Sequence, residues 1–476
     1  MTHCLIGLTL ALLALGLTQV NANVFQQTFR QLHQEPPLPA NQNRADVVQT
    51  LWIEQKLDHF NESDTRNWQM RYMLNDVFFK SGGPMFIFLG GEWEISQGRI
   101  TGGHMYDMAR EHNGLLAYTE HRYYGQSKPL PDLSNENIQY LHVKQALADL
   151  AHFITTQKNT YEGLSESKVI IVGGSYSATM VTWFKKVYPD LVAGGWASSA
   201  PLFAKINFVE YKEITGQSIA LMGGSGCYKR IENGIAEMET MFATKRGAEV
   251  KALLKLCEKF DVYSDLDIWT LFSEISDIFA GVVQTHNAGQ IEKVCETMMA
   301  ESSDLIGLSK YLLSVFAKSG GKCYDLSYDA ILATLLESRY TGNIMRQWIY
   351  QTCNEYGWYQ TSGSSAQPFG TKFPVALYTT MCADIYGSQY SNSFIQSKVE
   401  ETNKYFGGLT PNVKNVYLTH GHLDPWRAMG IQNETQATII PEYAHCKDFE
   451  SIKDTDTTEM KASKEKIAEL VRQWLK

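Results

Sequence analysis

Between about residues 51 and 201 the chain alternates short apolar runs with helical patterns, and this alternation constrains the fold more than any other feature. The apolar runs are short and lack the polar alternation of a half-exposed strand, so they fit strands buried on both faces. They occupy residues 83–91, 114–122, 168–174 and 191–199. Helical spacing of apolar residues fills two of the intervals, at residues 138–156 and 177–189. Strands that alternate with helices predict a mostly parallel sheet, so we expect a protein of the α/β class.

The alternation stops near residue 204, and mostly helical patterns follow as far as residue 371. Strand-like runs then return, and an amphipathic helix ends the chain. A chain of 476 residues is also long for a single small core. We therefore predict a core made of residues 45–204 and 372–476, with a helical, disulfide-containing cap, residues 205–371, inserted between them.

The first residues have the features of a secretory signal peptide. An apolar run over residues 4–18 is followed by Val-Asn-Ala ending at Ala22, a small-residue pattern typical of cleavage. No Lys or Arg precedes the run, and a signal anchor is the alternative, although the run is short for a bilayer span. We predict that residues 1–22 are removed and that the mature protein is secreted or lysosomal, with no membrane attachment.

Charge and cysteine content narrow the partners and the compartment. The formal net charge of -9 argues against nucleic acid or an anionic membrane as the main partner. Seven cysteines remain after signal removal, and an odd number leaves at least one thiol free or intermolecular, with the pairing open. Asn61 and Asn433 begin glycosylation sequons that a secretory protein could use. No Cys-x-x-Cys pair occurs, and His420 with His422 lacks a third ligand at a helpful spacing, so we expect no metal and no cofactor.

A serine follows one of the predicted buried strands at a tight turn. The apolar run leads through Gly173 and Gly174 to Ser175, and a helical pattern follows. A strand, a sharp turn and a helix with serine at the tip form the nucleophile elbow of α/β-hydrolases. Residues two positions before and after the serine must be small, and Gly173 and Ser177 satisfy this. The alternative is a glycine loop in which Ser175 only caps the helix.

The acid and base that such a serine needs are expected later in the chain, in the order serine, acid, histidine, each after a late strand. Asp424 and His445 each follow a strand-like run in this order. We predict that His445 deprotonates Ser175 and that Asp424 orients the imidazole. The amide of Tyr176 and the turn around Gly91 are the predicted oxyanion donors.

Several motifs together identify a family. The stretches "GGSYSATMVTWFKKVYPDLVAGGWASSAPL", "EHRYYGQSKP", "GHLDPW" and "AHCKDF" resemble the prolyl carboxypeptidase family of serine exopeptidases, which includes dipeptidyl peptidase II and the thymus-specific serine protease. The stretch "RQWIYQTCNEYGWYQT" is most similar to the thymus-specific branch and its invertebrate relatives. The resemblance extends from about residue 51 to the end of the chain. It implies an α/β-hydrolase core with a helical, disulfide-rich cap, and Ser175, Asp424 and His445 as catalytic residues. Many relatives carry Gly where this chain has Ala178.

The resemblance also implies peptide substrates that are cut near one terminus, often next to proline. Recognition of a free amino terminus needs a buried carboxylate, and Glu92 or Glu355 could supply it, although a structural role is the alternative for each. A carboxypeptidase would need a cation instead, for which Arg122 and Arg346 are available. We favour the dipeptidyl peptidase type. Trp348, in the aromatic segment 348–359, could line the specificity pocket, although packing in the core of the cap is the alternative.

Two other functions remain as alternatives at this point. One is a catalytically inactive hydrolase-fold protein that only binds, and the presence of all three predicted catalytic residues argues against it. The other is an esterase or lipase with the same catalytic residues, and the lack of a broad apolar lid argues against that. The oligomeric state stays open, with a homodimer as one option.

Overall fold

The computed structural model describes residues 24–39 and 47–476, so the predicted signal peptide, residues 1–22, lies outside the described residues. In the described part of the chain, none of the helices has both the length and the apolar character that a bilayer crossing requires.

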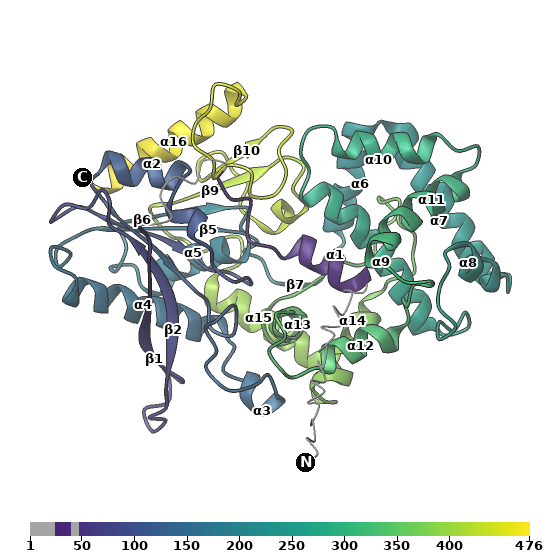
Figure 1. Ribbon diagram of the computed structural model, residues 1–476, viewed down its shortest axis with the longest axis horizontal. Helices are drawn as coiled ribbons and strands as arrows, with labels where there is room; N and C mark the ends of the chain where they lie inside the picture. The colour runs from purple at the N-terminus through teal and green to yellow at the C-terminus, as the bar shows by residue number, and fades with distance from the viewer. Residues whose placement is uncertain (1–23, 40–46) are drawn as a thin grey trace, which may run out of the picture.

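An eight-stranded sheet forms the centre of one half of the molecule (Figure 1). The strand order is β1-β2-β4-β3-β5-β6-β9-β10; β2 runs antiparallel to both its neighbours, and the remaining pairs are parallel. Strands β3 to β6 are buried along their whole length, as the continuous apolar runs predict. The strands are β1 (Gln49–Lys56), β2 (Asn67–Asn75), β3 (Met85–Leu89), β4 (Leu115–Thr119), β5 (Val169–Gly174), β6 (Gly194–Ser198), β9 (Val416–Gly421) and β10 (Ala437–Ile440).

Helices cover both faces of this sheet (Figure 1). The helices α4 (Val143–Thr160) and α5 (Tyr176–Val187) pack on one face, while α2 (His104–Glu111) and α16 (Thr458–Trp474) pack on the other. Successive strand residues serve opposite layers because side chains alternate along a strand. Ile87 therefore lies in the layer with α4 and α5, and Phe86 in the layer with α2 and α16. The fold of this half is an α/β-hydrolase core, as the sequence predicts.

The other half is a helical cap inserted between β6 and β9 (Figure 1). Its elements are β7 (Lys205–Asn207), α6 (Glu210–Gly223), α7 (Ser225–Ala243), α8 (Gly247–Leu253), α9 (Asp265–Gln284), α10 (Gln290–Met299), α11 (Asp304–Phe316), α12 (Tyr328–Leu336), α13 (Met345–Gln351), β8 (Gly357–Tyr359) and α14 (Val375–Tyr386). Helix α15 (Asn392–Phe406) leads back to the core, where Phe406 stacks on Trp183 of α5. The shorter helical turns are η2 (Gln97–Ile100), α3 (Asn135–Ile138), η3 (Ala317–Ser319), η4 (Thr352–Tyr356) and η5 (Pro425–Met429).

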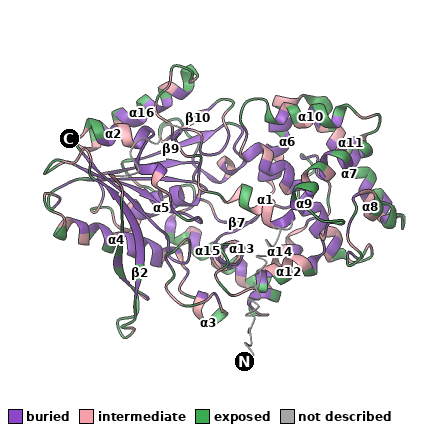
Figure 2. Cartoon of the chain, viewed as in Figure 1, coloured by how far each residue is buried: buried purple, intermediate pink, exposed green. Residues whose placement is uncertain are grey.

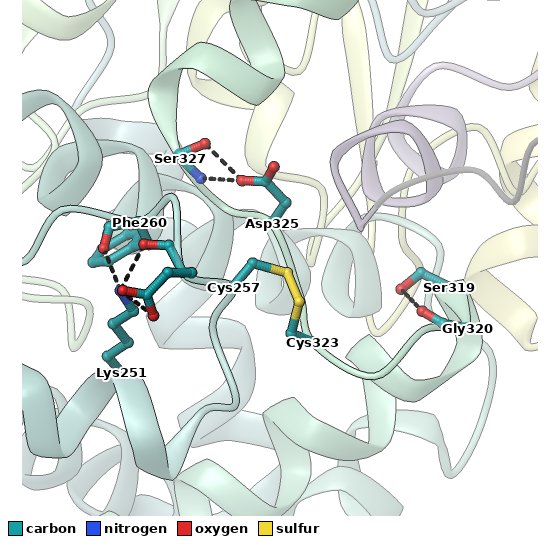
Figure 3. The surroundings of a disulfide bond; sticks show 9 residues. Lys251, Cys257, Phe260, Ser319, Gly320, Cys323, Asp325 and Ser327 are labelled. Carbon is teal, nitrogen blue, oxygen red and sulfur yellow. Dashed lines mark hydrogen bonds and ion pairs between the residues drawn. A yellow bond between two sulfur atoms is a disulfide. The ribbon is translucent and has the colours of Figure 1, made fainter.

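Three disulfides stabilise the cap. Each closes a long loop and so lowers the entropy of the unfolded chain. They join Cys227 to Cys295, Cys257 to Cys323 (Figure 3), and Cys353 to Cys382. The last of them ties α14 to the helix η4, so α14 is fastened to the cap although it begins just after the predicted limit at residue 371. Cys446 is the free thiol in the described residues. Disulfides of this kind indicate folding in an oxidising compartment.

Helix α1 (Val24–Leu32) belongs to neither half by sequence, and it lies between the sheet and the cap (Figure 1). Its residues Val24, Phe25 and Thr28 are buried, as are the sheet and the inner sides of the surrounding helices (Figure 2). The contacts of α1 with the cap are mainly to α9.

Candidate active site

Ser175 stands at the turn between β5 and α5 in a strained conformation. Its φ of 58° and ψ of -132° are rare for a residue with a side chain, and such strain is typical of a nucleophile elbow. The turn tolerates only glycine at 173, because a Cβ there would lie 2.5 Å from the carbonyl oxygen of Ser177. Within the described residues Ser175 makes no side-chain capping bond to α5, which contradicts the interpretation of this serine as a helix cap.

The elbow is fixed to its surroundings by hydrogen bonds. The Ser175 amide donates to the carbonyl of Ser198 in β6, at 2.9 Å. Ser177, which stands where many hydrolases have glycine, bonds through its hydroxyl to both the amide and the carbonyl of Gly174, each at 2.9 Å. The Ser177 hydroxyl therefore holds the turn with two hydrogen bonds that a glycine at this position could not make.

Asp424 and His445 meet beside this turn. Asp424 follows β9 and caps η5, with one carboxylate oxygen accepting from the Trp426 amide at 3.0 Å. The other oxygen lies 2.9 Å from Nδ1 of His445, which follows β10. Burial raises the pKa of Asp424, but the charge and hydrogen bond of His445, together with His420 and the Trp426 amide, lower it below its usual value. Burial likewise opposes the charged form of His445, yet Asp424 and Cys446 raise the pKa of this imidazole well above its usual value.

Ser175 and His445 line the same cavity, which has a volume of about 660 Å³. The cap contributes Gln284, Thr285 and Asn287 to its wall, and residues 31, 32 and 34–38 of the N-terminal segment contribute another part. The site therefore lies between the core and the cap. Its arrangement provides a hydroxyl, an imidazole and a buried carboxylate of the kind that acyl transfer uses.

The predicted oxyanion donors lie at the ends of two adjacent strands. Tyr176 opens α5, so its amide is among the first N–H groups of a helix, which have no partner within it. Gly91 follows β3, where the neighbouring Gly90 amide is fixed on the Thr119 carbonyl at 2.8 Å. A Cβ at Gly91 would lie 2.5 Å from the ring of Trp93, so a side chain would not fit. The oxyanion role of both residues stays a prediction.

Comparison with known proteins supports the same chemistry. The profile of Peptidase_S28, described as serine carboxypeptidase S28, matches residues 55–467. The chain belongs to the S28 family of serine peptidases. It is 29% identical to a putative serine protease, K12H4.7, of Caenorhabditis elegans over 90% of this chain and 89% of the relative. It is 29% identical to the thymus-specific serine protease of Mus musculus, covering 89% and 87%. Identity to the lysosomal Pro-X carboxypeptidase of Mus musculus is 27%, covering 86% and 84%.

Within this S28 site, a network of hydroxyl, imidazole and amide groups holds the Tyr176 side chain. Burial lowers the pKa of His121 to about 4, so its ring is neutral. Its Nδ1 lies 2.7 Å from the Arg122 carbonyl and must donate there, so Nε2 accepts from the Tyr176 hydroxyl at 3.1 Å. Gln351 donates to the same hydroxyl at 2.8 Å, and Tyr356 lies at 3.2 Å. Sequence reasoning missed His121 and Gln351, although His121 lies in the family stretch "EHRYYG".

The two candidate carboxylates of this family member differ in their surroundings. Glu355 accepts from the Val143 amide at 2.9 Å and lies 3.0 Å from Nδ1 of His142, so it is engaged at the start of α4. Glu92 is also buried, but its Oε1 lies 3.4 Å from His33 of the N-terminal segment, and its Oε2 has no partner among the described residues. Of these two carboxylates, Glu92 is therefore the one with an oxygen still free to accept a hydrogen bond within the described residues.

Trp348 lies near the elbow and near the N-terminal segment. Its ring packs edge-on against Tyr176, with 5.8 Å between centroids, and lies 4.9 Å from the ring of His33. It also stacks on Trp358 at 6.2 Å. An aromatic wall therefore extends from the elbow to the cap, in the region where the sequence predicts a specificity pocket.

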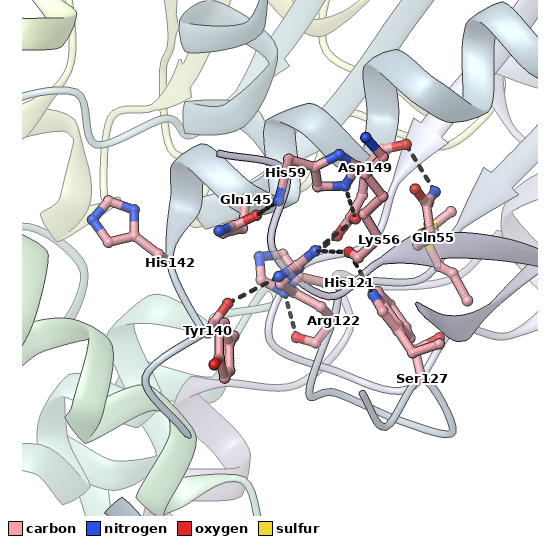
Figure 4. A network of polar contacts seen from close by, with 12 residues as sticks. Gln55, Lys56, His59, His121, Arg122, Ser127, Tyr140, His142, Gln145 and Asp149 are labelled. Carbon is pink, nitrogen blue, oxygen red and sulfur yellow. Dashed lines mark hydrogen bonds and ion pairs between the residues drawn. The ribbon is translucent and has the colours of Figure 1, made fainter. Parts of the chain in front are cut away.

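Neither of the cations suggested by the sequence is available to a substrate. Arg122 forms a two-point ion pair with Asp149, at 2.6 and 2.7 Å, and donates to the Leu57 carbonyl (Figure 4). Arg346 donates to the carbonyls of Leu133 and Leu335, at 2.8 and 2.7 Å. Both arginines are held by the fold itself, and this contradicts a substrate-binding role for either.

A third buried arginine, which the sequence analysis overlooked, lies close to the elbow. Arg99 donates to the carbonyls of Pro36 and Pro37 of the N-terminal segment, the latter at 2.8 Å. Its guanidinium rests over the ring of Phe449, which also contacts the Gly174 position. No sequence signal separates Arg99 from other arginines, because only its position in the fold brings it near Ser175.

The remaining candidates from the sequence are the pair of histidines and the two glycosylation sequons. His420 is buried with Nε2 3.1 Å from the Ile431 carbonyl, while His422 is exposed. Across residues 24–39 and 47–476, no three His, Cys, Asp or Glu side chains are grouped as a metal would require. Asn61 and Asn433 are exposed, and their glycosylation stays a prediction.

Proposed function

We propose that this S28 family member is a serine exopeptidase that removes residues from the amino end of peptides, by means of Ser175, His445 and Asp424. The observation that carries the proposal is the hydrogen bond between Asp424 and His445, beside a strained serine that lines the same cavity as the imidazole. A serine held in this way has the base and the orienting acid that it needs to act as a nucleophile.

In the proposed reaction the Ser175 oxygen attacks the peptide carbonyl carbon while Nε2 of His445 takes the hydroxyl proton. Asp424 accepts from Nδ1–H and so fixes the tautomer that leaves Nε2 free to accept. The amide of Tyr176 and the Gly91 turn stabilise the negative charge on the carbonyl oxygen. His445 then gives its proton to the leaving amine, the C–N bond breaks, and water hydrolyses the acyl-enzyme by the reverse sequence of proton transfers.

Glu92 gives the reason for placing the cut near an amino terminus. Its carboxylate is buried next to Gly91, and its Oε2 has no partner in the described part of the chain. A buried carboxylate oxygen without a partner is costly, and a substrate ammonium would supply both charge and hydrogen bonds. Trp348, whose ring contacts both His33 and Tyr176, offers an apolar surface on which a proline ring could pack. The name of the relative, Pro-X carboxypeptidase, supports a preference for proline.

The amino-terminal proposal is tested with dipeptide amides that carry a chromogenic leaving group. The wild-type protein, as secreted by a eukaryotic host, should lose about 100-fold in kcat/KM when the substrate amino group is acetylated, because a charge-assisted hydrogen bond is lost. Glu92→Gln should cleave the acetylated and free substrates at similar rates. Glu94→Gln is the matched control, since Glu94 is a largely exposed carboxylate two positions away. Equal effects of the two variants would overturn the assignment of Glu92.

Arg99 supports a second candidate, a carboxypeptidase. Its guanidinium is buried near the elbow and binds carbonyl oxygens of the N-terminal segment, so it could bind a substrate carboxylate instead. Digestion of a peptide library followed by mass spectrometry separates the two candidates, because it shows which end is shortened. Failure of a fluorophosphonate probe to label Ser175 between pH 4 and 8 would favour the inactive binding protein instead.

The same proposal places the protein in the secretory pathway, with export or the lysosome as its destination. Three disulfides support an oxidising compartment during folding, and one of the relatives is named a lysosomal enzyme. Detection of the tagged protein in culture medium or in lysosomes would decide between the two destinations.

A further inference from the structure

The N-terminal segment, residues 24–38, runs through the space between the core and the cap (Figure 1). Its helix α1 lines a cavity of about 130 Å³ in the cap through Phe25, Phe29 and Leu32. Its extended part, residues 34–38, lines the second cavity, the one that holds Ser175 and His445. One continuous stretch of chain thus covers both the catalytic residues and the adjoining hollow of the cap.

On the cap side the segment is fixed by polar contacts to α9 and the residue after it. The Thr28 hydroxyl donates to the carboxyl of Glu274, and both side chains are buried. Gln284 donates to the Leu32 carbonyl at 2.7 Å, while Gln31 donates to Thr285 at 3.1 Å. Burial and the charge of nearby Asp277 raise the pKa of Glu274 to about 8.

On the core side the segment contacts the elbow and the groups around it. Pro36 lies against the turn, with its Cγ 3.0 Å from the position of a Cβ at Gly174. Glu35 accepts from the Tyr118 hydroxyl at 2.9 Å, and Arg99 holds the carbonyls of Pro36 and Pro37. His33 places its ring 3.4 Å from the Glu92 carboxylate.

The segment supplies partners that a substrate would otherwise supply. Among the described residues, the hydrogen-bond partners of Glu92, Glu274 and Arg99 all come from residues 24–38. Buried ionisable groups that depend on one terminal segment would be left unpaired if it moved, unless another ligand replaced it. His33 in particular occupies the place at Glu92 and Trp348 that the proposed function gives to a substrate amino terminus.

We propose that residues 24–38 are an inhibitory segment that fills the peptide-binding cleft, and that its release admits substrate to Ser175. This inference rests on the proposed function, because it takes Ser175 to be the nucleophile. The cleft that opens would expose the carboxyl groups of Glu92 and Glu274, the guanidinium of Arg99 and the aromatic ring of Trp348. It would therefore accept an extended peptide with a free amino terminus.

The test uses the full chain with the recognition sequence of a site-specific protease in place of residues 40–45. Fluorophosphonate labelling and dipeptide-amide hydrolysis are measured before and after cleavage, and mass spectrometry of the gel-filtered protein checks that the segment has left. If the cleft is open in about 1% of intact molecules, both rates should rise about 100-fold on release. Thermal unfolding of both forms shows that the body stays folded.

Two variants of the intact chain add a matched comparison. Thr28→Val removes the hydrogen bond to Glu274 and should raise the labelling rate of the intact protein about tenfold, the equivalent of one buried hydrogen bond. Arg30→Ala changes an exposed residue of the same helix and should leave the labelling rate unchanged. A synthetic peptide of residues 24–38 should inhibit the cleaved protein, and a scrambled peptide should not.

The outcomes separate the two proposals. Equal labelling of the intact and cleaved forms, or no inhibition by the peptide, would overturn the inhibitory role and leave the proposed function standing. Labelling of neither form would overturn the proposed function, and the inhibitory role with it. A large gain on cleavage, reversed by the peptide, supports both.

Discussion

Two groups of buried charges lie near the elbow, and they differ in where their partners come from. Arg122 and Asp149 are paired inside the core, where His59 and backbone carbonyls complete their hydrogen bonds (Figure 4). Glu92 and Arg99 are buried to a similar degree, but their hydrogen bonds reach only the N-terminal segment in the described structure. The first group is complete without any ligand, and the second is not.

This difference separates structural charges from candidate binding groups. In a buried ion pair whose hydrogen bonds are all made within the fold, removing one partner leaves the other charge buried and unpaired. Such a change lowers the free energy of unfolding. A buried charge whose only partner is a terminal segment loses that partner when the segment leaves. Its desolvation is then uncompensated unless a ligand binds in place of the segment. Substitutions in the first group should therefore mainly reduce stability, whereas substitutions in the second should mainly change activity.

The largest effect is expected at the elbow itself. Ser175→Ala should lower kcat by about 10⁶-fold, by analogy with the loss of the nucleophile in subtilisin, while the unfolding midpoint stays the same. The assay is hydrolysis by the form from which the segment has been released. Ser225→Ala is the control, because this serine is also flanked by glycines but is exposed in the cap. Retention of most activity in Ser175→Ala would show that another group is the nucleophile.

The pH dependence of the reaction tests the pair formed by Asp424 and His445. His445 must be neutral to accept the proton, so kcat/KM should rise with pH through a midpoint above the usual imidazole value, because Asp424 and Cys446 raise this pKa against the effect of burial. Asp424→Asn removes the negative charge and should move the midpoint to lower pH. It should also reduce kcat by about 10⁴-fold, as in the analogous serine protease. An unchanged midpoint would exclude Asp424 as the orienting acid.

The next effect is on stability and concerns the paired group. Asp149→Asn keeps the shape of the side chain but leaves the Arg122 guanidinium buried without its counter-charge. The free energy of unfolding should fall by about 3–5 kcal/mol. Urea denaturation measures this loss, and Glu92→Gln in the released form is the comparison, with a change below about 1 kcal/mol. If both variants lost the same stability, the distinction between the two groups would fail.

The sequence predicted the fold and the elbow because both depend on local patterns. The apolar runs are continuous since their strands are buried on both faces, and Gly173 is required by the close approach of Ser177. The order of Asp424 and His445 after late strands follows from the topology of the fold, so it could be read along the chain. The structure adds the hydrogen bond between Asp424 and His445, which cannot be inferred from their positions in the sequence.

The sequence could not separate Glu92 from Glu355, or Arg99 from Arg122 and Arg346. These residues differ only in which distant groups surround them: Glu355 meets His142 and the start of α4, and Glu92 meets His33. The disulfide pairing was open for the same reason. Residues 24–32 have the apolar spacing of a helix, but nothing in their sequence shows in which cleft that helix lies.

A smaller effect is expected at Glu355, which the sequence left equal to Glu92. Glu355→Gln retains an acceptor for the Val143 amide but loses the charge opposite His142. We expect a loss of about 1–3 kcal/mol in the free energy of unfolding and no change in discrimination between free and acetylated dipeptide amides. A loss of that discrimination would assign the substrate amino terminus to Glu355 rather than Glu92.

The smallest effect is expected at Ala178, a position where the resemblance to the family implies glycine in many relatives. Its methyl group is buried in the first turn of α5, beneath the elbow, and its amide donates to the Ser175 carbonyl at 2.9 Å. Ala178→Gly should cost about 1 kcal/mol of stability, because glycine is the poorer helix former. The Ser177 hydroxyl still braces Gly174 in this variant, so kcat should stay within about threefold, less than 1 kcal/mol in the barrier. A much larger gain in kcat would mean that the methyl group strains the elbow, and that the turn, rather than the charges around it, limits this enzyme.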